Sequence, residues 1–317
     1  MKAAYITETG DPDTLTYGEL PEPTIAAPTE VLVRVRATSL NRRDVFAREG
    51  SHGTRPTRFP YVPGLDLAGE VLAVGPAVSR FKSGDRVMGE GSATYAEVAR
   101  AREDSLVAMP ASLSYEEAAA IPTVFSAAYH MLICRAHLGL GETMLVMAGG
   151  SGVGSAAIQI GKAMSARIIT TASSQEKLER AKALGAHVGV NYKEEDFAAR
   201  VREETGGEGV DLVFEHIGTP VWDGCFASLK RGGRLVTCGV TAGHLVTLHL
   251  GQLWTRDLTL IGTAQRPAED LAAIVRRVEQ GVFHGVVDSV LPLEAAAEAH
   301  RRLETSDFFG KIVLAMA

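Results

Sequence analysis

The feature that most constrains the fold is a regular alternation of apolar strands and helices between residues 143 and 262. The first run, residues 143–148, carries no charge, which is typical of a strand buried on both faces of a parallel sheet. Five more strands are predicted at 167–171, 188–191, 210–215, 233–238 and 258–262, with helices at 155–164, 174–184, 197–204 and 221–229. This α/β pattern predicts a Rossmann domain, a doubly wound parallel sheet.

The first 120 residues show a different pattern of predicted secondary structure. Short strands are predicted at 31–37, 69–75, near 82–89 and at 95–99, separated by Gly and Pro turns, and they indicate a small barrel or rolled sheet. Helices follow, one capped by Ser114 and one over about 124–137. A helix at about 267–280 and a strand at 311–314 come after the Rossmann segment. We therefore predict domains at 1–122 and 123–262, with 263–317 returning to the first domain.

Composition excludes several classes of protein. The 317 residues carry a net charge of −6 and no basic run, so neither nucleic acid nor a membrane surface is an expected partner. The N-terminus lacks a signal peptide's apolar core, and no apolar stretch is long enough to span a bilayer. Three widely spaced cysteines do not form a disulfide framework. These features predict a cytoplasmic protein with reduced thiols.

A glycine-rich turn, Ala148-Gly149-Gly150-Ser151-Gly152-Val153-Gly154, joins the first buried strand to the helix after it. Backbone N–H groups at a helix N-terminus stabilise a pyrophosphate, and missing Cβ atoms let it approach. Glycines needed only for packing are the alternative, but the strand–turn–helix setting favours a dinucleotide.

The end of the second strand bears on the choice of cofactor. An NAD site usually has an acidic residue there, which bonds the ribose 2′-OH. This chain instead has Ser173, Ser174 and Lys177, which can bind a 2′-phosphate. The serines can also act as helix caps, and Lys177 can lie on a solvated helix face. NADP(H) is therefore favoured, and NAD remains the alternative.

Motifs along nearly the whole chain resemble one family. In order they are residues 39–44, 48–50, 63–71, 84–87, the glycine-rich turn, 185–186, 191–192, 232–236 and 310–314. Together they resemble the medium-chain dehydrogenase/reductase superfamily, and within it the zinc-independent quinone oxidoreductases. The resemblance implies a GroES-like (chaperonin-10-like) β-barrel catalytic domain around the Rossmann domain, an active site between them, and NADPH-dependent hydride transfer to a small-molecule carbonyl or conjugated double bond.

The resemblance also assigns residues. Asn41, Asp44 and Thr123 would border the nicotinamide and the substrate. The residues assigned to the cofactor fall into three groups: Gly149, Gly150, Ser151, Gly152 and Val153 for the pyrophosphate; Ser173, Lys177 and Tyr192 for the 2′-phosphate; and Ile217, Gly218, Cys238, Gly239, Val240, Ile261 and Thr263 for the nicotinamide half.

Zinc is not expected in the catalytic chemistry. The superfamily's zinc enzymes need a Cys near position 41 and a His beside Gly64, where this chain has Asn41 and Leu65. The four-cysteine structural lobe is also missing. No metal is therefore predicted, and the proton would come from solvent or a hydroxyl such as that of Thr123.

Several alternatives stay open at this point. An alcohol dehydrogenase or enoyl reductase of the same fold, and an NADPH-binding protein with little catalysis, are rival functions. Asp66 is either a functional group or a structural bond in the turn after Gly64, and Asp44 is either functional or paired with Arg42, Arg43 or Arg48. A homodimer is expected, and the apolar strands 311–314 and 258–262 are the candidates for pairing across its two-fold axis.

Overall fold

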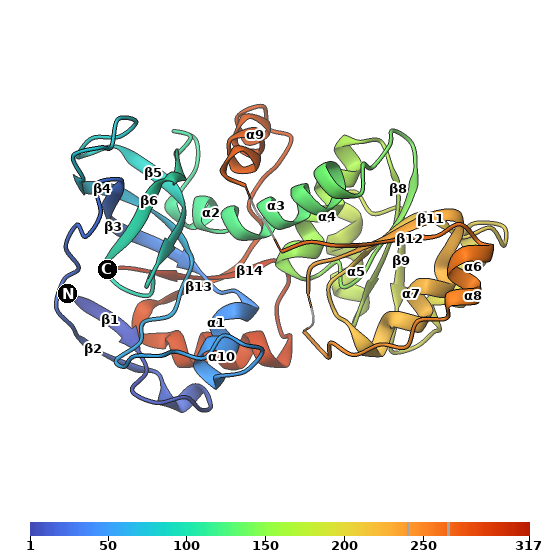
Figure 1. Ribbon diagram of the computed structural model, residues 1–317, viewed down its shortest axis with the longest axis horizontal. Helices are drawn as coiled ribbons and strands as arrows, with labels where there is room; N and C mark the ends of the chain where they lie inside the picture. Colours follow the sequence, from blue (N-terminus) through green and yellow to red (C-terminus); the bar gives the residue numbers. More distant parts are fainter. Residues whose placement is uncertain (240, 265–266) are drawn as a thin grey trace. The chain divides into compact units, whose positions relative to one another are not determined.

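The computed structural model describes residues 1–239, 241–264 and 267–317. The chain divides into two compact units (Figure 1). One unit comprises Met1–Thr123 with Leu271–Ala317, and the other comprises Val124–Asp270. The second unit therefore interrupts the sequence of the first.

The first unit is built on a six-stranded sheet in the order β13-β14-β3-β4-β5-β6. An additional pairing between β3 and β6 closes strands β3 to β6 into a barrel. The strands of the whole unit are β1 (Lys2–Tyr5), β2 (Thr16–Glu19), β3 (Glu30–Ser39), β4 (Asp66–Val74), β5 (Arg86–Ser92), β6 (Val98–Ala108), β13 (Val287–Pro292) and β14 (Lys311–Ala315). Its helices are η1 (Pro12–Thr14), α1 (Arg42–Glu49), α2 (Tyr115–Ala119), η4 (Leu293–Ala295) and α10 (Ala296–Thr305).

The barrel core confirms the period-two pattern read from β3. Val31, Val33 and Val35 are buried together with Leu67 and Val87 from the neighbouring strands. The fourth strand differs from the prediction, because β6 begins at Val98 rather than at residue 95 and is longer. Residues before it pair with β1 only through an isolated bridge, so they do not extend the strand.

The expectation that residues 311–314 pair across a two-fold axis is wrong. β14 runs parallel to β13 on one side and antiparallel to β3 on the other. Both of its edges are therefore hydrogen-bonded within the chain, and no edge remains for a second copy.

The second unit holds a parallel sheet in the order β12-β11-β10-β7-β8-β9. Its strands are β7 (Thr143–Val146), β8 (Arg167–Ala172), β9 (Val188–Asn191), β10 (Val210–Glu215), β11 (Leu229–Thr237) and β12 (Thr259–Gly262). Its helices are α4 (Gly152–Ala163), α5 (Gln175–Leu184), α6 (Phe197–Glu204), η3 (Thr219–Val221), α7 (Trp222–Ser228) and α8 (Leu250–Thr255). The strand order reverses between β7 and β10, and such sheets bind ligands at this switch point. Helices α4 and α5 contact each other on one face, and α6 and α7 on the other (Figure 1).

Two predicted helices have different bounds. Helix α4 begins at Gly152, three residues before the predicted start, because Ser151 caps it and accepts a hydrogen bond from the Gly154 N–H. The run predicted over 124–137 is divided into α3 (Pro122–Tyr129) and η2, a π-helix over His130–Arg135. The predicted helix near 267–280 is α9 (Ala268–Glu279).

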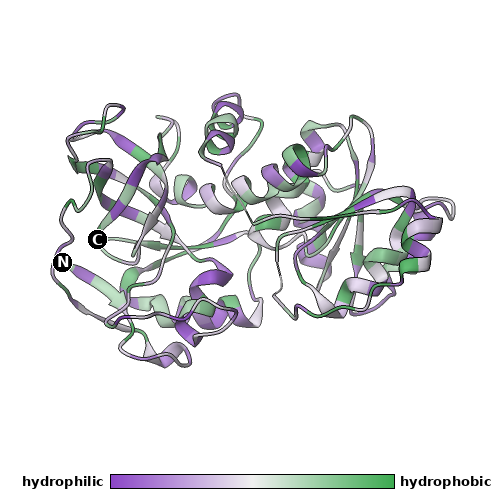
Figure 2. Cartoon of the chain, in the orientation of Figure 1, coloured by the Kyte–Doolittle hydropathy of each residue, from purple (hydrophilic) through white to green (hydrophobic). Residues whose placement is uncertain are grey.

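Hydropathy follows the architecture. In Figure 2 polar residues mark α1 and α10. The apolar run Met144–Val146 is buried within β7. Among the described residues, every helix is too short or too polar to cross a bilayer.

Candidate functional site

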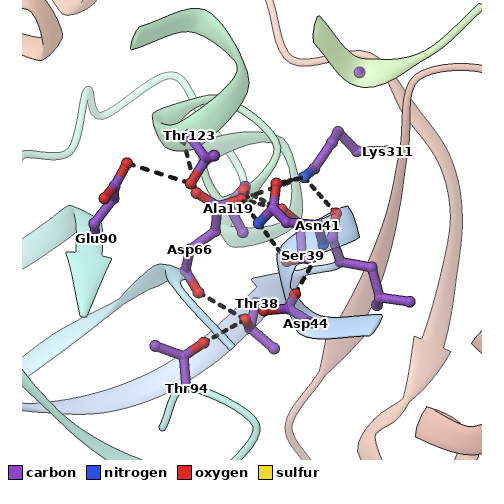
Figure 3. A network of polar contacts seen from close by, with 12 residues as sticks. Thr38, Ser39, Asn41, Asp44, Asp66, Glu90, Thr94, Ala119, Thr123 and Lys311 are labelled. Atoms are coloured by element: carbon purple, nitrogen blue, oxygen red, sulfur yellow. Dashed lines mark hydrogen bonds and ion pairs between the residues drawn. The ribbon is translucent and has the colours of Figure 1, made fainter. Parts of the chain in front are cut away.

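A buried carboxylate, that of Asp66, organises the polar site of the first unit (Figure 3). Its Oδ2 accepts hydrogen bonds from Ser39 Oγ at 2.7 Å and Asn41 Nδ2 at 2.8 Å. Its Oδ1 accepts one from the Thr123 N–H at 2.8 Å. Asp66 therefore joins the end of β3, the start of α1 and the start of α3. Its role extends well beyond a local bond in the turn after Gly64.

Lys311, the first residue of β14, places a buried ammonium in the same network. Its Nζ donates to Leu40 O at 2.5 Å and Asn41 Oδ1 at 2.7 Å, and it lies 3.3 Å from Asp66 Oδ2. Burial lowers the pKa of Lys311, and the charges of Asp66 and Asp44 act against that shift. The sequence offered only a family motif here, so the place of this buried lysine in the network was missed.

Asp44 closes the network from the first turn of α1. Its Oδ2 accepts hydrogen bonds from the Asn41 N–H at 2.8 Å and from Tyr95 Oη at 3.2 Å. Burial raises the pKa of Asp44 to about 6, although the Asn41 N–H and Lys311 oppose that rise. The suggested ion pair with Arg48 is not formed, since Arg48 pairs with Glu49 and Glu304.

Two of the residues predicted to be catalytic differ in how their polar atoms are used. The Asn41 amide is bonded at both ends, to Lys311 through Oδ1 and to Asp66 and Ser39 O through Nδ2. The Thr123 hydroxyl has one long hydrogen bond, to Glu90 Oε1 at 3.3 Å. Thr123 therefore has the more available polar atom, and Asn41 is better placed to hold the network together.

The glycine-rich turn of the second unit has no room for side chains at two positions. A Cβ on Gly149 would lie 2.2 Å from Thr170 Oγ1, and one on Gly154 would lie 2.3 Å from Ala148 O. The turn is tied to β8, because the Ala148 N–H donates to Thr171 Oγ1 at 3.0 Å. The structure thus forms the close strand–helix approach that a pyrophosphate site needs. Gly150, Ser151, Gly152 and Val153 complete this turn at the N-terminus of α4.

The residues predicted for a 2′-phosphate follow two neighbouring strands. In the ladder between β8 and β9, Ala172 pairs with Asn191, so Ser173 and Tyr192 follow adjacent strand ends. Tyr192 is 49% exposed, and its N–H donates to Ala172 O at 3.3 Å. Ser174 caps α5 and accepts a hydrogen bond from the backbone of Lys177. Ser174 therefore acts as a helix cap, which was one of the two readings of the sequence.

The residues predicted for the nicotinamide half lie at or just after the carboxyl ends of β10, β11 and β12. Glu215, which the sequence analysis missed, accepts hydrogen bonds from the N–H groups of Ile217 and Gly218 and from Thr237 Oγ1. The remaining predicted positions are Cys238 and Gly239 just after β11, Ile261 in β12 and Thr263 just after it, while Val240 lies outside the described residues.

His216 is a third residue that the sequence analysis missed, after Lys311 and Glu215. Its Nε2 lies 3.0 Å from Met147 O and 3.4 Å from Ser151 Oγ, directly against the glycine-rich turn. Burial lowers the pKa of His216. A mostly neutral imidazole therefore borders the predicted pyrophosphate position.

The positions of zinc ligands in related enzymes hold other residue types. Asn41 and Leu65 offer neither a thiolate nor an imidazole. Over the described ranges, the one group of three side chains with metal-ligating atoms close together is His130, Cys134 and Asp270. His130 Nδ1 lies 2.8 Å from an Asp270 carboxylate oxygen, so the imidazole already partners that carboxylate.

Comparisons with known proteins match both units. A family model described as zinc-binding dehydrogenase matches residues 152–280, and one described as the alcohol dehydrogenase GroES-like domain matches residues 27–122. A quinone oxidoreductase of Lama guanicoe is 31% identical over 99% of this chain and 97% of its own. An acryloyl-coenzyme A reductase of Metallosphaera sedula is 30% identical over 90% of this chain and 92% of its own.

Solved structures of similar proteins match the whole chain as well. An NAD-dependent alcohol dehydrogenase has a TM-score of 0.93 and 38% identity, covering all of both chains. The Escherichia coli quinone oxidoreductase complexed with NADPH has a TM-score of 0.91 and 28% identity, covering 99% of this chain and all of the other. The predicted Rossmann and GroES-like architecture is confirmed.

Proposed function

The chain belongs to the medium-chain dehydrogenase/reductase superfamily as a quinone oxidoreductase-like oxidoreductase, and from this premise we propose that it uses NADPH to transfer a hydride to a quinone, an enone or another carbonyl without zinc. The observation that carries the proposal is the glycine-rich turn at the switch point of the sheet, where Gly149 and Gly154 let the turn pack closely on β8 and α4, the arrangement that a pyrophosphate site needs. When bound, the cofactor supplies the hydride.

NADPH is favoured over NADH by the residues after β8 and β9. Ser173, Lys177 and Tyr192 offer hydroxyls and an ammonium there, and no acidic residue lies at the end of β8 to bond a 2′-OH. The quinone oxidoreductase complexed with NADPH supports this choice, whereas the NAD-dependent alcohol dehydrogenase supports the alternative. The three cysteines are free thiols, in keeping with the cytoplasmic location that we also propose.

A screen of purified protein tests the proposal. We expect oxidation of NADPH with a quinone or an enone, and a kcat/KM at least about 10-fold lower with NADH, because one charge-assisted phosphate contact contributes about 1.5–3 kcal/mol. Lys177→Ala should raise the KM for NADPH and leave that for NADH nearly unchanged. Equal kinetics with both cofactors would contradict the NADPH assignment. Tight NADPH binding without turnover of quinones, enones or aldehydes would favour a binding protein.

We assign Thr123 as the hydroxyl nearest the reacting group and Asn41 and Asp44 as residues that position it. Thr123→Val keeps the shape and the N–H bond to Asp66 but removes the hydroxyl. We expect kcat to fall roughly 10- to 100-fold, because a lost hydrogen bond to a developing charge contributes about 1.5–3 kcal/mol, with an unchanged Kd for NADPH. Thr123→Ser should restore most of kcat. Unchanged turnover in Thr123→Val would remove Thr123 from the mechanism.

We also propose a homodimer formed through β12, since β14 is not available. β12 is an edge strand of the parallel sheet, and exposed apolar residues precede it in the same unit, with Trp254 73% and Leu250 65% exposed. Pairing of two such edges would cover unpaired backbone groups and apolar side chains together. Sedimentation of the full chain as a monomer would contradict this.

A further inference from the structure

A basic cavity lies beside α1 in the first unit. Its volume is about 360 Å³, and its polar lining consists of Arg43, Arg55, Arg58, Thr54, Thr57 and Tyr61. The residues that line it include three guanidinium groups and no carboxylate. Such a volume falls in the range of cavities that hold part of an organic ligand.

The positive charge of this cavity is not neutralised within the described chain. Across residues 1–239, 241–264 and 267–317, the guanidinium groups of Arg43, Arg55 and Arg58 form neither a hydrogen bond nor an ion pair. Arg48, on the same helix as Arg43, is by contrast buried and paired with Glu49 and Glu304. Three unpaired guanidinium groups around one cavity attract an anion and offer it forked N–H donors.

The cavity lies next to the polar network around Asp66. Arg43 and Ala47 line it from α1, and Asp44 lies between them in the sequence of that helix. Burial raises the pKa of Tyr61. The charge of Asp44 raises this pKa further, and the charge of Arg43 lowers it. The cavity therefore lies on the same helix as Asp44 and within the range of its charge.

We propose that this cavity binds a phosphate-bearing end of the substrate, so that the chain reduces an anionic enone or thioester in preference to a small neutral quinone. The inference rests on the proposed function, because the reducible bond would lie at the Thr123 end. Arginine forks match the geometry of phosphate oxygens, and the hydroxyls of Thr57 and Tyr61 add neutral donors, whereas the Thr54 hydroxyl already donates to Ser51 O. A cavity larger than one phosphate suits a phosphate attached to an organic chain.

A matched pair of substrates tests the proposal. With NADPH, crotonyl-coenzyme A is compared with crotonyl-pantetheine, which has the same reducible bond and no phosphate. We expect a KM at least about 10-fold lower for crotonyl-coenzyme A, rising with ionic strength because charged contacts are screened. Arg55→Gln with Arg58→Gln should remove this advantage and leave kcat and the kinetics of crotonyl-pantetheine nearly unchanged. Arg102→Gln, which removes an exposed charge on β6, is the control and should change neither.

A binding measurement separates failure of this inference from failure of the proposed function. Protein saturated with NADP⁺ is titrated with coenzyme A by calorimetry, which needs no turnover. Salt-dependent binding that is lost in the double arginine variant supports the cavity, even if no substrate is reduced. Equal binding by the wild type and the double variant, or none by either, overturns the inference. Turnover of both thioesters with equal KM overturns it as well while leaving the proposed reductase activity intact.

Discussion

Replacing Lys311 by Met is expected to lower the free energy of unfolding by about 3–5 kcal/mol, the usual effect of removing one partner of a buried ion pair. The Lys311 side chain is 4% exposed and that of Asp66 is fully buried, so water cannot replace the lost ammonium. Leu40 O and Asn41 Oδ1 would lose a donor at the same time. Urea denaturation followed by circular dichroism measures the change.

Two further variants separate charge from packing at Lys311. Combining Lys311→Met with Asp66→Asn removes both charges and should recover part of the lost stability, because no buried charge is then left unpaired. The recovery is incomplete because an amide nitrogen cannot accept the hydrogen bonds that both carboxylate oxygens accept from Ser39, Asn41 and Thr123. Lys2→Met removes an exposed partner of Glu19 and should change stability by less than about 1 kcal/mol. A Lys311→Met protein as stable as the wild type would show that this ammonium does not stabilise the fold.

Replacing Gly154 by Val is expected to raise the Kd for NADPH at least about 100-fold, which corresponds to about 2.7 kcal/mol. A Cβ at this position would lie 2.3 Å from Ala148 O and 2.9 Å from Gly149 Cα. Both are backbone atoms of the glycine-rich turn, so the turn and the start of α4 must move apart. The N–H groups that would face the pyrophosphate would move with them.

A second glycine in the same helix provides the control for Gly154. At Gly161 a new Cβ would meet Met144 Sδ at 2.6 Å, the flexible part of a side chain rather than the backbone. Gly161→Ala should therefore reduce stability slightly and change the Kd for NADPH less than about 3-fold, well under one kcal/mol. Fluorescence titration with NADPH measures both variants. Equal affinity of Gly154→Val and the wild type would place the cofactor away from this turn.

The predictions that agree with the structure rest on local patterns, in which the residues that form the signal are close together in the sequence. The uncharged run over β7 and the period-two pattern of Val31, Val33 and Val35 lie where they were predicted. Capping by Ser114 also agrees, since its hydroxyl accepts a hydrogen bond from the Glu117 N–H. The short elements β1, β2 and β13 had no such signal; β1 pairs with β2, and β13 pairs with β14.

The candidate sites also differ in whether their residues are close together in the sequence. The glycine-rich turn is contiguous, so its residues could be predicted as a group from spacing alone. The network around Asp66 joins residues 39, 41, 44, 123 and 311, which only the closed barrel and the returning C-terminal strand bring together. The three arginines of the cavity likewise gave no pattern in the sequence, since an exposed arginine is ordinary on any surface.

The sequence by itself therefore determined the parallel sheet, its phosphate-binding turn and the absence of the usual zinc ligands at positions 41 and 65. Each of these depends on residues close together in the chain. Only the tertiary structure decided that Lys311 pairs with Asp66, that the Asn41 amide is bonded at both ends, and that β14 is an interior strand. The physical reason is that burial and the choice of distant partners depend on how the whole chain packs.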